Sequence, residues 1–118
     1  MTTRIAIALT IAAAFILILL TPAPTAASTA AAPLASDHAR AVYEDYGCVA
    51  CHGDSGNGSC DLRRANETFP TDAALRAFID DPSATHPGSK MPAYRNVIEA
   101  ADYPALIAHV RRLSRQAR

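Results

Sequence analysis

The residues best suited to chemistry stand in one short run, Cys48-Val49-Ala50-Cys51-His52. Two cysteines three positions apart lie on one face of a helical turn, so both thiols can reach one planar group. The imidazole of His52 follows directly and can lie under the centre of that group. This is the spacing by which c-type haem is attached, with two thioethers on the porphyrin and a histidine on the iron. The run predicts one covalent haem c, held by Cys48 and Cys51, with His52 as an axial iron ligand.

Two other readings of this run stay open. Cys-x-x-Cys is also a dithiol redox motif, although that motif lies between a strand and a helix, and no βαβ pattern occurs here. Together with Cys60, the two cysteines and His52 would also make the Cys3His set of a structural zinc site. Adjacent ligands such as Cys51 and His52 would chelate one zinc awkwardly, and no second Cys-x-x-Cys pair follows.

The second axial position on the iron needs its own ligand, and Met91 is the strongest candidate. It lies far enough beyond His52 for the chain to return on the opposite face, and Pro92 fixes the turn after it. A Met/His pair raises the reduction potential and closes both faces of a haem. The alternatives are that Met91 is a core side chain, or that His86 binds instead and gives bis-histidine ligation at a lower potential.

Cys60 has no partner left among the three cysteines once the haem attachment is assigned. It reads either as a small buried hydrophobic residue or as a free thiol in an exported protein. A free thiol of that kind is redox-sensitive or forms an intermolecular disulfide, so a Cys60-linked dimer is one expected assembly.

The first 27 residues read as an export signal. A basic start with Arg4 precedes an apolar run over residues 5–20, and small residues follow as far as Ala27. This is the order of a secretory leader, and we expect cleavage after Ala27. The alternative is a retained membrane anchor, although the run falls a little short of the roughly 20 residues that span a bilayer. Membrane contact is expected only in that case, and either form predicts the periplasm or the outer face of the cytoplasmic membrane.

The charge balance excludes some partners. The 118 residues contain 11 Lys and Arg and 11 Asp and Glu, so no strong field is expected and nucleic acid is excluded as a partner. One basic cluster closes the chain, and we expect it to be a solvated helix end; it comprises Arg111, Arg112, Arg115 and Arg118. Without the leader about 90 residues remain, enough for one small core that needs a staple such as a covalent haem.

We expect residues 28–36 to be a linker and residues 37–118 to form one domain. A first helix should begin at a cap on Ser36 or Asp37 and run to about Tyr46, with Gly47 ending it. Its apolar face follows a helical period and comprises Ala39, Val42, Tyr43 and Tyr46.

Two further helices follow. Thr71 should cap the second, and Pro82 should stop it after Asp81; its buried stripe comprises Ala74, Leu75, Phe78 and Ile79. Residues 83–95 are rich in turns. The last helix should run from about Tyr103 to Arg115, capped by Asp102; its apolar face comprises Leu106, Ile107, Val110 and Leu113. No segment alternates with the period of a strand, so the predicted class is all-α.

The chain resembles the class I (monohaem) c-type cytochromes of bacterial type. The resemblance runs from about His38 to Leu113, and its most specific parts are the runs 48–53 and 89–94. It implies a small cytochrome c fold, with three to four short helices packed around one covalently attached haem. We expect Leu62 and Tyr94 to contribute to the haem pocket.

This chain departs from the family pattern at three places. Ala39 stands where the family usually has glycine, and His109 stands where an aromatic residue is common. Ser59-Cys60 replaces a Gly-Pro pair whose proline carbonyl commonly accepts the N–H of the proximal histidine. We expect the Cys60 carbonyl to take over that contact less rigidly.

The resemblance implies a carrier of one electron rather than an enzyme. Outer-sphere transfer would run through an exposed haem edge, and the partners would be redox proteins that meet the chain through small, transient interfaces. The alternative classes are a haem enzyme or gas-sensing haem domain with an open iron site, and a zinc-binding Cys/His domain.

Overall fold

A computed structural model of the chain describes residues 31–116. The expected leader, residues 1–27, lies outside the described residues. Over the described part the chain forms helices and turns without a strand, which confirms the all-α class. No helix in this part is both long enough and apolar enough to cross a membrane.

Residues 31–116 contain two long helices, one of intermediate length and three of a single turn. Their bounds are α2 Ala31–Asp45, α3 Val49–His52, α4 Ala65–Thr68, α5 Asp72–Asp80, α6 Pro82–Thr85 and α7 Tyr103–Gln116. The count exceeds the predicted three to four because α3, α4 and α6 have four residues each. A single turn is too short to show a hydrophobic period.

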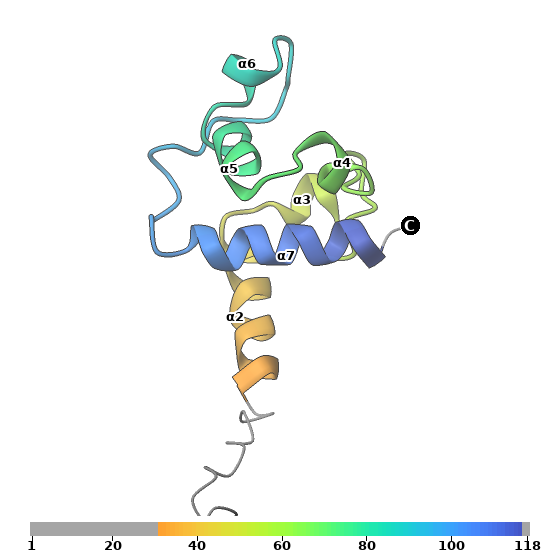
Figure 1. Cartoon of the computed structure of the whole chain (residues 1–118), viewed down its shortest axis with the longest axis vertical. Coiled ribbons are helices and arrows are strands. Elements are labelled where there is room, and N and C mark those ends of the chain that lie inside the picture. The colour runs from red at the N-terminus through yellow and green to blue at the C-terminus, as the bar shows by residue number, and fades with distance from the viewer. Residues whose placement is uncertain (1–30, 117–118) are drawn as a thin grey trace, which may run out of the picture.

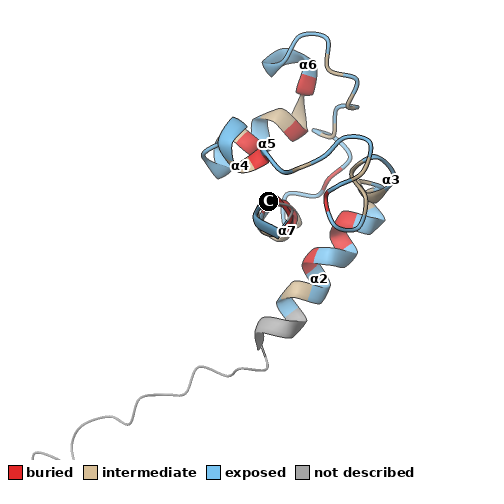
Figure 2. Ribbon diagram, turned by 90° about the vertical axis from the view of Figure 1, so that its right-hand side faces the viewer, coloured by how far each residue is buried: buried red, intermediate tan, exposed pale blue. Residues whose placement is uncertain are grey.

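The crossing of α2 and α7 is the centre of the fold (Figure 1). On α2 the buried residues are Ala39, Val42 and Tyr43. On α7 the buried apolar residues include Leu106, Ile107, Val110 and Leu113. Figure 2 marks these stretches of the two helices as buried. The predicted face of α7 is therefore confirmed, and so is that of α2 apart from Tyr46, which is half-buried in the turn after the helix. The helix α5 packs on α7 with Leu75 and Ile79 buried.

The helix α2 begins at Ala31, before the predicted cap at Ser36 or Asp37. Residues 31–36, which we expected to belong to a linker, are therefore helical. Alanine is the best helix former, and this stretch is rich in it. The helix ends before Gly47, whose φ of 73° suits a glycine that reverses the chain. The division into leader, linker and domain stays a prediction.

Two capping side chains define α5 and α6. The Thr71 hydroxyl accepts a hydrogen bond from the Ala74 N–H at 3.1 Å, which confirms the predicted N-cap of α5. Pro82 ends α5 as predicted, and it also begins α6, because the Asp81 carboxylate caps the Ala84 N–H at 3.1 Å. The stretch after Asp81 was expected to contain only turns, so α6 is an addition.

Arg111 corrects the expectation of a solvated basic tail. Its side chain is 14% exposed and lies across the segment that joins α4 to α5. Its guanidinium donates to the Asp72 carboxylate at 3.1 Å, the Asn66 side-chain oxygen at 3.1 Å and the Phe69 carbonyl at 2.6 Å. A guanidinium that donates to three acceptors holds α7 to the segment between α4 and α5, and is not a helix end exposed to solvent.

Candidate functional site

The Cys-x-x-Cys-His run forms the short helix α3 and the turn before it. The Cys48 N–H donates to the Tyr43 carbonyl at 3.1 Å, and the His52 N–H donates to the Cys48 carbonyl at 3.0 Å. Cys48 is half-buried and Cys51 is exposed. The turn is therefore hydrogen-bonded directly to the end of α2, which fixes the positions of both thiols.

The ring of His52 is held from one side. Its Nδ1 lies 2.5 Å from the Cys60 carbonyl oxygen. A carbonyl can only accept, so Nδ1 carries the proton and Nε2 is left with a free lone pair. This tautomer suits a histidine that binds a metal through Nε2, because the partner of the other nitrogen sets the orientation of the ring. The contact expected at Cys60 is confirmed.

The loop after His52 is fastened by backbone hydrogen bonds. The Gly58 N–H donates to the His52 carbonyl at 2.9 Å, and the Cys60 N–H donates to the Cys51 carbonyl at 3.0 Å. A proline at position 60 could not make the second bond. The loop thus gains a hydrogen bond where the cytochromes that the sequence resembles usually have a rigid proline ring.

This loop also needs glycine at position 58. A Cβ atom there would stand 2.4 Å from the Cys51 carbonyl oxygen and 2.7 Å from the His52 carbonyl carbon. Only a residue without a side chain lets these two pieces of backbone approach so closely.

An apolar cavity opens beside α3. Two adjoining hollows share eight lining residues, and the larger has a volume of about 410 Å³. Their shared lining residues are Cys48, His52, Leu62, Ala65, Phe69, Phe78, Met91 and Tyr94. Cys51 and Cys60 line only the larger of the two hollows. A volume of this size lies in the range of small-molecule and cofactor sites.

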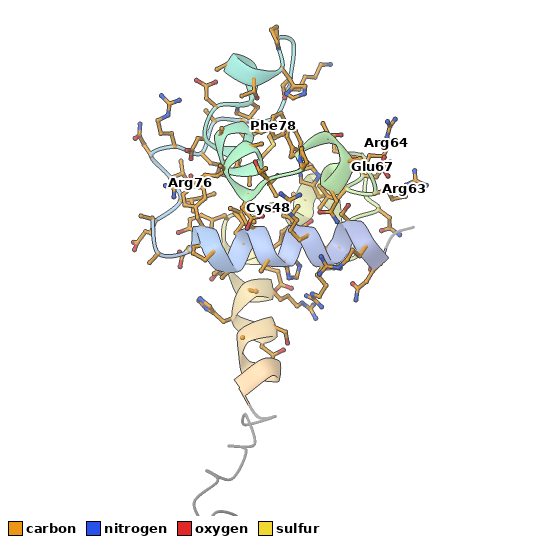
Figure 3. The ribbon with its side chains drawn as sticks, in the orientation of Figure 1. Cys48, Arg63, Arg64, Glu67, Arg76 and Phe78 are labelled. Atoms are coloured by element: carbon orange, nitrogen blue, oxygen red, sulfur yellow. The ribbon has the colours of Figure 1, made fainter. Side chains whose placement is uncertain are left out.

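All six predicted site residues therefore line one cavity. Cys48, Cys51 and His52 come from α3 and its preceding turn, Leu62 from the loop that follows, and Met91 and Tyr94 from the segment after α6. Figure 3 shows Cys48 near the centre of the fold and Phe78 on α5 above it. Their roles in holding a cofactor stay predictions.

The Met91 segment is attached mainly through its ends. The Met91 N–H donates to the Ser89 hydroxyl at 3.3 Å. Beyond it, the Tyr94 N–H donates to the Ile79 carbonyl at 3.1 Å and the Arg95 N–H donates to the Asp80 carbonyl at 3.2 Å. These two bonds fix the segment to the end of α5, and Met91 lines both hollows of the cavity.

Electrostatics agree with an apolar cavity. Burial raises the pKa of the Cys48 thiol and that of the Tyr94 phenol. Desolvation disfavours the charged form of both groups, so the part of the wall formed by Cys48 and Tyr94 is uncharged and suits a largely hydrophobic plate.

The competing ligands find less support. His86 is exposed, and its ring stands edge-on to Phe69 and Phe78 at 5.4 and 5.2 Å between centroids. It does not line either hollow. Within residues 31–116 no three His, Cys, Asp or Glu side chains converge to hold a metal ion, so the Cys3His zinc site is not assembled.

The donor set and the cavity fit a c-type haem. Two thiols, one imidazole and one thioether line the same cavity, and the imidazole has the tautomer that an axial ligand needs. Cys48 and Cys51 would hold the porphyrin edge, and His52 and Met91 would bind the iron.

The structure adds cavity residues that the sequence did not single out. Phe69 and Ala65 contribute to both hollows, although neither was proposed for the site. Phe69 stacks on Phe78 with ring centroids 4.5 Å apart, a contact that no local sequence pattern indicates. Ala65 is the first residue of α4, and no sequence pattern indicates that this helix begins there, because Arg64 at the N-cap makes no side-chain capping bond.

Comparisons with known proteins point the same way. A family model described as cytochrome C oxidase, cbb3-type, subunit III matches residues 35–110. Cytochrome c oxidase subunit 2 of Alkalihalophilus pseudofirmus is 32% identical over 92 residues, covering 66% of this chain and 25% of that protein. The chain thus spans about a quarter of the length of this curated relative. No solved structure matches the chain.

Proposed function

We propose an electron-transfer function with His/Met-ligated haem c for this chain, which belongs to the cytochrome c oxidase, cbb3-type, subunit III family and is a c-type cytochrome. Family membership implies a haem cofactor. The observation that carries the finer proposal is the convergence of Cys48, Cys51, His52 and Met91 on one apolar cavity. When bound, the haem supplies the one-electron redox chemistry.

The chain's own residues give that haem its environment. Cys48 and Cys51 attach it covalently, so the cofactor stays bound in either redox state. His52 keeps its proton on Nδ1 through the Cys60 carbonyl and presents Nε2 to the iron. Met91 would supply the second iron ligand, and the apolar side chains of Leu62 and Tyr94 would keep water from the haem. A thioether ligand and a dry pocket both favour the ferrous state and raise the potential.

Electron exchange is proposed to run through the open side of the cavity. Exposed residues lie along its larger hollow, among them Cys51, Cys60 and Lys90. A partner docked there would approach the edge of the haem without displacing a ligand. Outer-sphere transfer needs no substrate site, which supports a carrier rather than an enzyme.

The partners are proposed to be redox proteins that bind transiently. The name of the curated relative is that of an oxidase subunit, which favours a respiratory chain as the setting. We place the chain in the periplasm or on the outer face of the cytoplasmic membrane. A dimer linked through the exposed thiol of Cys60 is part of the same proposal.

A haem enzyme or gas sensor is the second candidate function. The observation that favours it is the sparse fastening of Met91, whose N–H bond to Ser89 is long at 3.3 Å. If Met91 leaves the iron easily, an external ligand gains access.

Replacement of Met91 by alanine tests the carrier proposal. We expect the midpoint potential of the haem-loaded protein to fall and the ferrous protein to bind carbon monoxide rapidly, because a ligand position opens. Potentiometric titration and carbon monoxide binding measure the two effects. The matched control is Val97→Ala, which shortens an exposed, uncharged side chain outside both hollows and should change neither.

Two results would decide against the assignment. An unchanged potential together with a closed site in Met91→Ala would remove Met91 as the ligand. Rapid carbon monoxide binding by the unmodified protein at neutral pH would favour the open-site candidate instead.

A further inference from the structure

His109 is a polar side chain in the middle of the α2–α7 crossing. It is 2% exposed, at a position where the class I c-type cytochromes that the sequence resembles commonly carry an aromatic residue. Its ring lies against that of Tyr43, with centroids 4.7 Å apart and planes inclined by 32°. A buried imidazole can replace an aromatic ring in such packing only while it is uncharged, because a buried charge is costly.

Arg112 fixes the tautomer of this neutral ring. Its Nη2 lies 2.9 Å from Nδ1 of His109. A guanidinium only donates, so Nδ1 accepts and Nε2 carries the proton of the neutral ring. That buried N–H has no hydrogen-bond partner among the described residues. A second proton would occupy Nδ1, abolish the bond from Arg112 and place two cations in contact.

The charges around His109 oppose that proton. Arg112 stands on the same helix, and Arg40 and Glu44 face the ring from α2, where they form an ion pair of 2.6 Å. Burial lowers the pKa of His109, Arg112 and then Arg40 lower it further, and Glu44 opposes them. Protonation therefore favours opening of the crossing, at a pH below the ordinary histidine value of about 6.5.

Tyr43 connects this crossing to the site. Its hydroxyl donates to the Gly53 carbonyl at 2.9 Å, and its ring is 1% exposed. Gly53 follows His52 directly, and its N–H donates to the Val49 carbonyl at 2.8 Å. The ring that packs on His109 therefore also anchors the end of α3, so a shift of Tyr43 moves the backbone beside His52.

We propose that His109 is a proton-responsive positioning residue for the haem-binding turn, acting through the Tyr43 hydroxyl on the Gly53 carbonyl beside His52. Above the ordinary histidine pKa the neutral ring holds Tyr43 in place. Below it the opened crossing takes up a proton on His109, so opening becomes more frequent, Tyr43 is released and the turn loosens. The effect on the haem rests on the proposed function, whereas the effect on the turn does not.

Amide hydrogen exchange of the full exported protein tests the turn. Peptides spanning residues 47–58 are followed by mass spectrometry from about pH 8 to pH 5, with rates corrected for intrinsic exchange. We expect opening of the turn to increase by up to about tenfold per pH unit below about pH 6.5, because one proton is taken up on opening. His109→Gln, which keeps an acceptor for Arg112 but does not titrate, should abolish this dependence.

Three further variants separate titration from packing. His109→Phe keeps a ring against Tyr43 and should also remove the pH dependence, so the result does not depend on one variant folding. Tyr43→Phe loses the hydroxyl and should free the turn at every pH. His38→Ala, at an exposed histidine of α2, should behave as the unmodified chain. Equal pH dependence in the unmodified and His109→Gln proteins would overturn the proposal.

The reduction potential gives a second, independent readout. In the haem-loaded protein it should fall as the pH falls through the same range, because a loosened turn admits water to a pocket whose dryness favours ferrous haem. This pH dependence should vanish in His109→Gln and in Tyr43→Phe. A pH dependence that survives in Tyr43→Phe would overturn the path through the hydroxyl. A protein without haem would contradict the proposed function, and hydrogen exchange would still decide for or against His109.

Discussion

The two sides of the cavity are built differently. On the His52 side, residues 47–62, backbone bonds join the loop to α3, and the Tyr43 hydroxyl and Cys60 carbonyl fasten the helix and the ring. On the Met91 side, residues 82–95, the chain is fixed chiefly to the end of α5, and the methionine N–H has one long bond to a serine hydroxyl.

This difference indicates which ligand can be exchanged. Hydrogen-bonded loops open only together with the elements that they join, whereas a segment fixed at its ends opens locally at lower cost. We therefore expect His52 to stay in place whenever the fold is intact and Met91 to be the ligand that leaves first. Variants on each side can test this contrast between His52 and Met91.

Gly58→Ala should have the largest effect, because on the His52 side the backbone at position 58 packs directly against that of Cys51 and His52. The new Cβ would meet backbone atoms of Cys51 and His52 below 3 Å. We expect a loss of about 3 kcal/mol in the free energy of unfolding, as in other overpacked sites, with less haem per chain. Urea denaturation and the haem-to-protein ratio measure both.

Gly88→Ala is the matched change on the Met91 side. Nothing lies within 4 Å of its Cβ position, but its φ of 91° is strained for alanine, at a cost of about 1 kcal/mol. Equal losses at Gly58 and Gly88 would mean that the two sides are equally rigid.

Arg111→Ala should come next, because this side chain holds the segment that carries Phe69 into the cavity wall. Removing a charged donor from three acceptors should lower the free energy of unfolding by about 2 kcal/mol. Arg64→Ala is the control. Arg64 is 83% exposed, its ion pair with Glu67 spans 3.5 Å, and it points outward at the edge of the fold (Figure 3). Arg64→Ala should produce no measurable loss in the free energy of unfolding. Similar losses in both variants would show that the Arg111 hydrogen bonds do not hold this segment.

Cys60→Pro and Cys60→Ser separate the backbone of Cys60 from its thiol. Proline keeps the carbonyl that holds His52 but removes the N–H bond to Cys51, which should cost about 1 kcal/mol. Serine keeps both and should leave stability unchanged, while any dimer that reducing agents dissociate should disappear. Thermal unfolding and non-reducing electrophoresis check the pair. A stable proline variant would show that the backbone bond contributes nothing.

Ser89→Ala should have the smallest effect on stability, because its bond to the Met91 N–H is long and near the surface. We expect a change within about 0.5 kcal/mol, equivalent to about a twofold faster displacement of Met91 by imidazole. Stopped-flow mixing of the ferric protein with imidazole measures the rate. A tenfold change would place the control of Met91 in this single bond.

The long helices and their faces were predictable because burial repeats with the helical period. Val42 and Tyr43 on one helix and Leu106 and Val110 on the other follow that rule. Thr71 was readable because a capping hydroxyl acts within its own turn. The candidate site was also readable, since Cys48, Cys51 and His52 are neighbours in sequence and depend little on distant packing.

What the sequence did not predict depends on contacts between distant segments. Ser114 is fully buried because it binds the Asn66 N–H and the Arg63 carbonyl, and Arg111 is mostly buried for a similar reason. Neither polar residue shows its partner locally. The helix α6 was missed because Pro82 was read only as a stop, whereas Asp81 before it is also a helix cap.

The central claim is that one haem is covalently attached and ligated by His52 and Met91. The most direct test is the near-infrared magnetic circular dichroism spectrum of the ferric exported protein, because the charge-transfer band reports both axial ligands at once. The account predicts a low-spin spectrum with the signature of histidine and methionine. A high-spin or bis-histidine spectrum, or a protein with no haem signal, would contradict it.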